Sequence, residues 1–256
     1  MLETPWPKPH FLREAAPLPL AKRMPEVEKH FDEELRAFKE KLLFMGSHAE
    51  AAVTRSLEAM WSRNDSMALQ VERDDDVLDR FEIEIDELAV NLLTKAPLAS
   101  DLRMVVVGMK VSHNLERIGD EATTISRRAV ELNREPALLV SVDVSGMAKL
   151  ALQMLKEALD SFTQMRPDIA RSVVPQDKKV DAMNRQFQQE LSRTMVQDPS
   201  RINACLNMMS ICKSIERVGD HAANIAEEVV YLYEAMDIRH AGSLSADGHS
   251  SGGRDS

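Results

Sequence analysis

Carboxylate residues recur in pairs along this chain, four positions apart. The pairs are Asp75 and Asp79, Glu116 and Asp120, Asp177 and Asp181, and Glu216 and Asp220. On an α-helix, residues at this spacing are neighbours with Cβ atoms about 5–6 Å apart, so two like charges there repel each other. A bound cation would remove the repulsion, and sites made only of oxygen ligands suit Mg²⁺, Ca²⁺, Mn²⁺ or iron. The pattern therefore predicts metal sites.

An acidic stripe surrounds the first pair. Steps of three and four place five carboxylates on one stripe about 80° wide, without an intervening Lys or Arg: Glu72, Asp75, Asp79, Glu82 and Asp86. The matching stripe further along the chain is half neutral: Asp177, Asp181, Asn184 and Gln188. A solvated acidic face is the alternative interpretation of both stripes. At about 100° per residue, Glu116 and Asp120 lie about 140° and 180° from the apolar stripe of their own helix. We expect them to face away from the bundle core.

Basic residues follow one flank of the helix that carries Glu116. Arg103, Lys110 and Arg117 are spaced by seven, and Arg217 repeats Arg117 further along the chain. These cations predict either a docking edge for an acidic partner or a set of surface salt bridges, which contribute little to stability. Their spacing favours neither interpretation.

The chain contains an internal duplication. Residues 114–125 read NLERIGDEATTI and residues 214–225 read SIERVGDHAANI. Glu, Arg, Gly, Asp, Ala and Ile recur in register at an offset of 100 residues, together with the apolar positions. A period of this length indicates two copies of one supersecondary unit. Gly119 and Gly219, at equivalent positions, predict close helix packing.

The elements that position these residues are predicted to be long helices. Aromatic residues make up 4% of the chain and there are 9 glycines, which is poor material for sheets. Apolar residues recur at helical spacing, and the expected helices span about 30–61, 66–95, 98–133, 143–165, 168–197 and 200–236. Pro97 and Pro136 end the second and third, and Pro175 kinks the fifth or marks its true start.

The predicted fold is all-α, with two tandem pseudo-symmetric three-helix bundles built from six long helices. Expected boundaries are a Pro-rich tail at 1–27, the first repeat at 28–136, the second at 140–237, and a Gly/Ser-rich tail at 238–256.

Charge and composition exclude several function classes. A formal net charge of −10 and a pI near 5.3 make nucleic acid and anionic membranes poor partners. No apolar run approaches the length of a membrane span, and the N-terminus lacks the apolar region of a signal peptide. Cys205 and Cys212 are the only cysteines, and we expect them to fill the core of a cytoplasmic protein.

The motifs argue against an enzyme. The sequence has no glycine-rich phosphate loop, no G-x-S-x-G, no Cys/His constellation and no E-x-x-H, the motif of carboxylate-bridged di-iron bundles. A metal-storage protein or metal-dependent enzyme remains an alternative, but it would need ligands buried inside the bundle. A scaffold that uses the 15 methionines is a further one, although their spacing indicates packing.

These motifs together resemble the PhoU family of phosphate-transport regulators. The resemblance covers roughly residues 30–236: HFDEELRAFKEKLLFMG at 30–46, D-x-x-x-D at 75–79, P-x-x-x-DLR at 97–103, LERIGDEA at 115–122 and IERVGDHA at 215–222. The Pro-rich N-terminal segment departs from the family pattern.

The resemblance implies a fold and a function. It implies two three-helix bundles in a cytoplasmic regulator that represses phosphate uptake and the phosphate-starvation response, and we expect a homodimer. The implied partners are the ATPase of the phosphate ABC transporter and a sensor histidine kinase, and the membrane is reached only through them. The resemblance also implies metal clusters of iron, Mn, Mg or Zn on the four carboxylate pairs. Pro175 puts the geometry of the Asp177 and Asp181 site in question.

Overall fold

The computed structural model describes residues 25–95, 98–138, 143–235 and 238. Across these residues it contains α-helices and two short 3₁₀ helices, and no strand. The predicted tails fall outside the described residues, except that residues 25–27 belong to the first helix and that Ile238 is described. Pro97 also lies outside them. The all-α class is confirmed.

Helix α1 spans Pro25–Ser62 and begins ahead of the predicted start at His30. Its buried residues follow steps of three and four, which places them on one face: Phe31, Phe38, Leu42, Met45, Ala49, Val53, Leu57 and Met60. Arg63, with φ of 52°, ends the helix in the left-handed region. Asn64 then caps the next helix, since its side chain accepts a hydrogen bond of 3.1 Å from the backbone N–H of Met67.

The prediction of one continuous second helix is wrong, because the structure divides this region into α2 (Asp65–Arg73) and α3 (Asp76–Leu93). The break falls in a run of three aspartates, a residue type whose short side chain competes for the backbone's hydrogen bonds. Asp74 is held outside the helix by Arg55, whose Nη1 lies 3.0 Å from Asp74 Oδ2. The carboxylates that follow favour the positive end of α3.

The third and fourth helices agree with their predicted ranges. Helix α4 spans Ala99–Asn133 and helix α5 spans Val144–Gln164. Asp143 caps α5 by accepting a 2.8 Å hydrogen bond from the backbone N–H of Gly146. Met165, with φ of 55°, ends it.

Pro175 interrupts the fifth predicted helix, as the sequence indicated. The region consists of α6 (Pro167–Val173), a 3₁₀ helix η1 (Val174–Gln176) and α7 (Asp177–Gln197). Proline has no N–H to donate and its ring clashes with the preceding turn, so α7 starts just after it. A second 3₁₀ helix η2 (Pro199–Arg201) leads into α8 (Ile202–Glu234).

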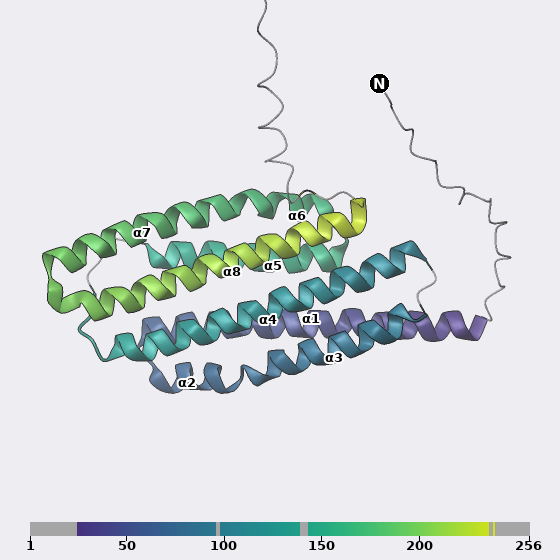
Figure 1. Cartoon of the computed structure of the whole chain (residues 1–256), viewed down its shortest axis with the longest axis horizontal. Coiled ribbons are helices and arrows are strands. Elements are labelled where there is room, and N and C mark those ends of the chain that lie inside the picture. Colours follow the sequence, from purple (N-terminus) through teal and green to yellow (C-terminus); the bar gives the residue numbers. More distant parts are fainter. Residues whose placement is uncertain (1–24, 96–97, 139–142, 236–237, 239–256) are drawn as a thin grey trace, which may run out of the picture.

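The two repeats lie side by side, with α4 and α8 as their central pair (Figure 1). Helices α4 and α8 run antiparallel and make the most extensive contact between elements. In the same view α2 and α3 flank α4 on one side, α6 and α7 flank α8 on the other, and α1 and α5 lie behind. This arrangement exposes one broad face made by α3, α4, α8 and α7.

Both bundles contribute to one apolar core. A continuous cluster contains Phe38 and Leu115 of the first repeat and Met154 and Ile215 of the second. Cys205 and Cys212 are buried and unpaired, and burial raises the pKa of the Cys212 thiol to about 12, so the expectation of core filler is confirmed. Among the described helices, none combines the length and apolar character that crossing a membrane requires.

Candidate functional site

The carboxylate pairs of the second repeat meet in one cluster between α7 and α8. Asp181, Glu216 and Asp220 each offer an oxygen, and these oxygens lie within 4.8 Å of one another. Asp177, the first residue of α7, lies near Asp220, and the two carboxyl groups shift each other's pKa. The start of α7 after Pro175 therefore places Asp177 beside the cluster.

The cluster of the second repeat holds more negative charge than its surroundings balance. Burial raises the pKa of Asp177 and of Glu216, and nearby carboxylates add to both effects. Burial and the neighbouring Asp177 raise the pKa of Asp220 to about 6. Lys213 pairs with Glu216 and, by lowering its pKa, offsets part of the effect of burial. Raised pKa values mean that the ionised form of these groups lacks sufficient positive charge nearby.

Buried oxygens make the donor set suitable for a metal ion. Among the described residues, Asp177 Oδ1 is buried without a hydrogen-bond partner, and the buried Glu216 Oε2 has the Lys213 ammonium beside it. Glu216 is only 6% exposed. Buried carboxylate oxygens are costly without a partner, and hard cations bind such ligands. The four carboxylates therefore fit a cation, which would hold them ionised.

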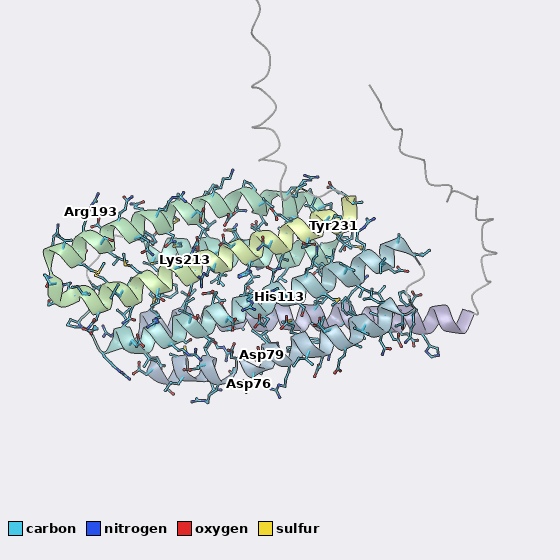
Figure 2. The ribbon with its side chains drawn as sticks, viewed as in Figure 1. Asp76, Asp79, His113, Arg193, Lys213 and Tyr231 are labelled. Atoms are coloured by element: carbon cyan, nitrogen blue, oxygen red, sulfur yellow. The ribbon has the colours of Figure 1, made fainter. Side chains whose placement is uncertain are left out.

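The first repeat builds a related cluster between α3 and α4. Asp75 lies at the break before α3 and lines the same pocket as Thr123 of α4. Burial raises the pKa of Asp75 and of Glu116, and Asp120 and Asp79 raise both further. Arg117 Nη1 lies 3.1 Å from Asp120 Oδ2. This cluster is more open than the second, since Asp79 is exposed on the outer face (Figure 2).

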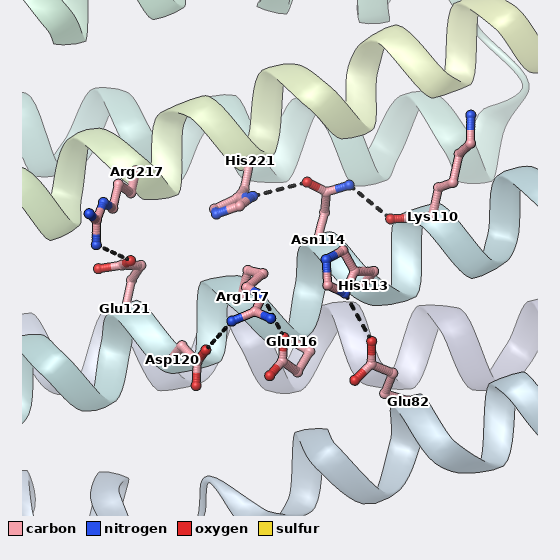
Figure 3. A network of polar contacts seen from close by, with 10 residues as sticks. All are labelled: Glu82, Lys110, His113, Asn114, Glu116, Arg117, Asp120, Glu121, Arg217 and His221. Atoms are coloured by element: carbon pink, nitrogen blue, oxygen red, sulfur yellow. Dashed lines mark hydrogen bonds and ion pairs between the residues drawn. The ribbon is translucent and has the colours of Figure 1, made fainter.

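His113, which the pattern of carboxylate pairs does not indicate, joins the first cluster. Glu82, His113 and Glu116 offer ligand atoms that lie within 4.8 Å of one another. His113 Nδ1 is 3.1 Å from Glu82 Oε1 (Figure 3). The signal was present in the sequence, because His113 and Glu116 are three residues apart on one helix and therefore share a face.

The expectation that these carboxylates face away from the core is wrong for the two glutamates. The side chain of Glu116 is 15% exposed and that of Glu216 is 8% exposed. Helices α3 and α7 pack against this flank of α4 and α8, so each acidic stripe covers the pair on its neighbour. The direction of the carboxylates is therefore no argument against a metal-dependent reaction.

The four predicted docking cations are engaged within the chain. Three of them connect α4 with α8. Arg103 Nη1 lies 3.3 Å from the carbonyl oxygen of Leu232, Lys110 Nζ lies 3.1 Å from Glu228 Oε1, and Arg217 Nη1 lies 3.1 Å from Glu121 Oε1. Arg117 stays on its own helix, between Glu116 and Asp120. Arg103, Lys110 and Arg217 thus join the two repeats to each other.

The family model of the PhoU domain matches this chain twice, over residues 42–129 and 144–229. The chain belongs to the PhoU family. The two matches correspond to the two three-helix units, and each includes one Glu-Arg-x-Gly-Asp motif. The predicted duplication and the family resemblance are both confirmed.

The chain is similar in sequence to curated PhoU proteins from bacteria. The chain is 38% identical over 218 residues to the phosphate-specific transport system accessory protein PhoU homolog of Pseudomonas aeruginosa, covering 84% of this chain and 90% of that protein. It is 32% identical over 222 residues to the phosphate-specific transport system accessory protein PhoU of Escherichia coli, covering 86% and 92%. These relatives are named as accessory proteins and not as enzymes.

Solved PhoU structures share the fold. The crystal structure of PhoU from Pseudomonas aeruginosa superposes with a TM-score of 0.78 at 38% identity, covering 80% of this chain and 100% of that one. The phosphate transport system regulatory protein PhoU from Streptococcus pneumoniae gives 0.75 at 27% identity, covering 81% and 99%. The prediction of two pseudo-symmetric helical bundles is confirmed.

Proposed function

We propose that this chain is a negative regulator of phosphate uptake and of the phosphate-starvation response. It acts as a cytoplasmic adaptor between the ATPase of a phosphate ABC transporter and a sensor histidine kinase, and it works as a homodimer. The membership of the PhoU family, with relatives named for phosphate-specific transport, is the observation that carries this proposal.

Regulation of this kind needs only binding that differs between states of the partner. An adaptor that binds one conformation of the kinase or ATPase more tightly than another shifts that partner's equilibrium. A rigid double bundle with one shared core suits this role, because it presents fixed surfaces to both partners.

We further propose that both carboxylate clusters bind metal ions. The ligands are Asp75, Asp79, Glu116 and Asp120 in the first repeat, and Asp177, Asp181, Glu216 and Asp220 in the second. Iron, Mn, Mg or Zn would neutralise carboxylates whose pKa values burial raises, and so would fix α3 to α4 and α7 to α8. Elemental analysis of the purified protein, with Asp79, Glu116 and Glu216 replaced together, tests this proposal, and unchanged metal content would refute it.

Alkaline phosphatase activity in a deletion strain tests the regulatory role. Cells grown with excess phosphate should show high activity without the gene and low activity when the intact gene is returned. Low activity in the deletion strain would argue for the second candidate, a metal-binding storage or scaffold protein without a phosphate role. The partly buried carboxylate cluster of α7 and α8 is the observation that favours this second candidate.

A further inference from the structure

A groove with a volume of about 500 Å³ opens where α3, α4 and α8 meet. Its charged lining residues are Glu82, Asp86, Lys110, His113, Glu227 and Glu228. Figure 3 shows Lys110 and His113 on α4 and Glu82 on α3. Four carboxylates face one ammonium group, so the groove carries a net charge of −3 with His113 neutral.

The equivalent positions in the other repeat carry the opposite charge. The offset of 100 residues relates Glu227 and Glu228 to Arg127 and Arg128, and His113 to Lys213, which Figure 2 shows on α8. The acidic stripes relate Glu82 and Asp86 to Asn184 and Gln188, and Lys110 corresponds to Ser210. Two guanidinium groups and one ammonium group give these six positions a net charge of +3. Of these two equivalent sets of positions, one is therefore acidic and the other basic.

An apolar strip continues the groove toward the start of α4. It consists of Val90, Leu98, Leu102 and Val106, whose exposed fractions are 59%, 63%, 47% and 37%. Leu102 and Val106 are four residues apart and so share one face of α4, and Leu98 precedes the helix as its N-cap residue.

The register of α3 and α4 places Val90 beside the other members of the strip. The pairing of Glu82 with His113, at 3.1 Å, fixes that register. Val90 follows Glu82 by eight residues on α3, and Val106 precedes His113 by seven residues on α4. Each helix advances about 1.5 Å per residue, so these two valines lie at the same level.

We propose that the groove and the apolar strip together form a docking surface for an amphipathic, basic segment of a partner protein. Apolar side chains of the segment cover the strip, and its lysine or arginine side chains enter the groove beside Asp86 and Glu227. Charge complementarity selects a basic partner and disfavours an acidic one. Covering exposed apolar side chains supplies binding free energy of about 25 cal/mol per Å² of apolar surface.

Other occupants fit this surface less well. A metal ion held by Glu82, His113 and Glu116 would lie at one edge of the groove, whereas the groove spans three helices and reaches Glu227 and Glu228 on α8. A second copy that offered its basic end would make a head-to-tail contact, which leads to open assemblies unless it closes into a ring. The inference rests on the proposed adaptor function, since it names the chemistry of one partner.

The test uses a fluorescein-labelled helical peptide of about 14 residues, with leucines on one face and lysines on the other. A glutamate version of the peptide is the charge control. Fluorescence anisotropy with the full chain, at about 150 mM salt to screen non-specific attraction, should give binding of the lysine peptide and none of the glutamate peptide.

Charge variants locate the binding. The variant D86K/N224K changes two exposed positions in the groove and adds three positive charges. The matched control E40K/Q189K adds the same charge at exposed positions of α1 and α7. We expect the Kd for the lysine peptide to rise about tenfold in D86K/N224K and in L102S/V106S. In the control variant the Kd should change less than about twofold.

Two outcomes of the peptide experiments would overturn the proposal. One is equal weakening by D86K/N224K and E40K/Q189K, which would show attraction to net charge alone. The other is a photo-reactive lysine peptide that cross-links outside α3, α4 and the last turns of α8, a measurement that stays informative if a variant unfolds. Light scattering that shows salt-sensitive self-association through Asp86 would assign the surface to a second copy instead. A deletion strain without a phosphate phenotype would refute the regulatory role and leave the peptide result unchanged.

Discussion

Asp220 on α8 and Asp177 at the start of α7 interact across the contact between the two helices, where burial and the neighbouring Asp177 together raise the pKa of Asp220. Two carboxylates this close repel each other unless one of them is protonated. The pKa of Asp220 is raised to about 6, so this group takes up the proton close to neutral pH. The metal-free cluster therefore stores a destabilising charge at pH 7 that a proton or a cation removes.

The stability of the metal-free protein should fall as pH rises through about 6. The folded-state pKa of Asp220 lies above its ordinary value of 3.8, so the folded state binds the proton more tightly than the unfolded state. The contribution of Asp220 to the free energy of unfolding is then fully present below pH 4 and is lost as pH rises through the folded-state pKa. With partial solvent screening we expect a loss of about 1 kcal/mol. Urea unfolding of EDTA-treated protein at several pH values measures this change.

The variant Asp220→Asn isolates this effect. An amide keeps the shape and cannot ionise, so the variant should be more stable than the parent at pH 7 and should lose much of the pH dependence between 4 and 6. The exposed Glu40→Gln on α1 serves as the control. A pH dependence unchanged in Asp220→Asn would assign the titration to other groups.

Metal removal should lower the melting temperature and affect the second cluster more. A ligand that binds only the folded state, at about 100 times its Kd, stabilises by about 2.7 kcal/mol. We expect Mn²⁺ or iron to raise the melting temperature of the chelator-treated protein. The variant D181N/E216Q/D220N should lose more of this shift than D79N/E116Q/D120N, because Glu216 is buried and Asp79 is exposed. Equal shifts in both variants and the parent would place metal binding elsewhere.

The helical fold could be predicted because its determinants are local. The spacing of Phe38, Leu42 and Met45 specifies the buried face of α1 without knowledge of any neighbour. The recurrence of Gly-Asp at 119–120 and 219–220 specifies the duplication in the same way.

The burial of Glu116 and Glu216 could not be predicted from their own helices. A helical projection gives the direction of a side chain relative to one core, and here α3 and α7 cover that direction. For the same reason, the sequence could not decide between docking and ion pairing for Lys110, whose Nζ lies 3.1 Å from Glu228 Oε1 on another helix. The break before Asp76 was missed because the apolar period continues through it, and Arg55 decides it from another helix.

Glycine positions in the two repeats should respond differently to alanine. A Cβ at Gly108 would lie 2.4 Å from Cε1 of the Phe38 ring, whereas a Cβ at Gly219 would lie 3.5 Å from Val180 Cγ1. Gly108→Ala should therefore destabilise by about 1–3 kcal/mol through overpacking. Gly219→Ala should stabilise by up to about 1 kcal/mol, since alanine is the better helix former. Urea unfolding of both variants measures the difference, and equal effects would contradict the packing described here.

The ion pair between Arg217 and Glu121 should stabilise the contact between the repeats. Glu121 is 8% exposed, and Arg217 Nη1 lies 3.1 Å from its Oε1, while Oε2 is buried without a hydrogen-bond partner among the described residues. Arg217→Met leaves this carboxylate buried without its cation and should cost about 1–3 kcal/mol. Glu121→Gln alone should cost less, because it removes the buried charge, and Arg217 is half exposed to water.

The double variant R217M/E121Q completes a thermodynamic cycle for this contact. Since the amide needs no counter-charge, the double variant should recover part of the stability that Arg217→Met loses, which gives a coupling energy of about 0.5–3 kcal/mol. Urea unfolding of the four proteins at one pH measures it. Additive effects would mean that the two side chains are held apart in solution. In that case the contact between α4 and α8 would depend on the apolar core and on the other polar contacts, such as Lys110 with Glu228 and Arg103 with the carbonyl oxygen of Leu232.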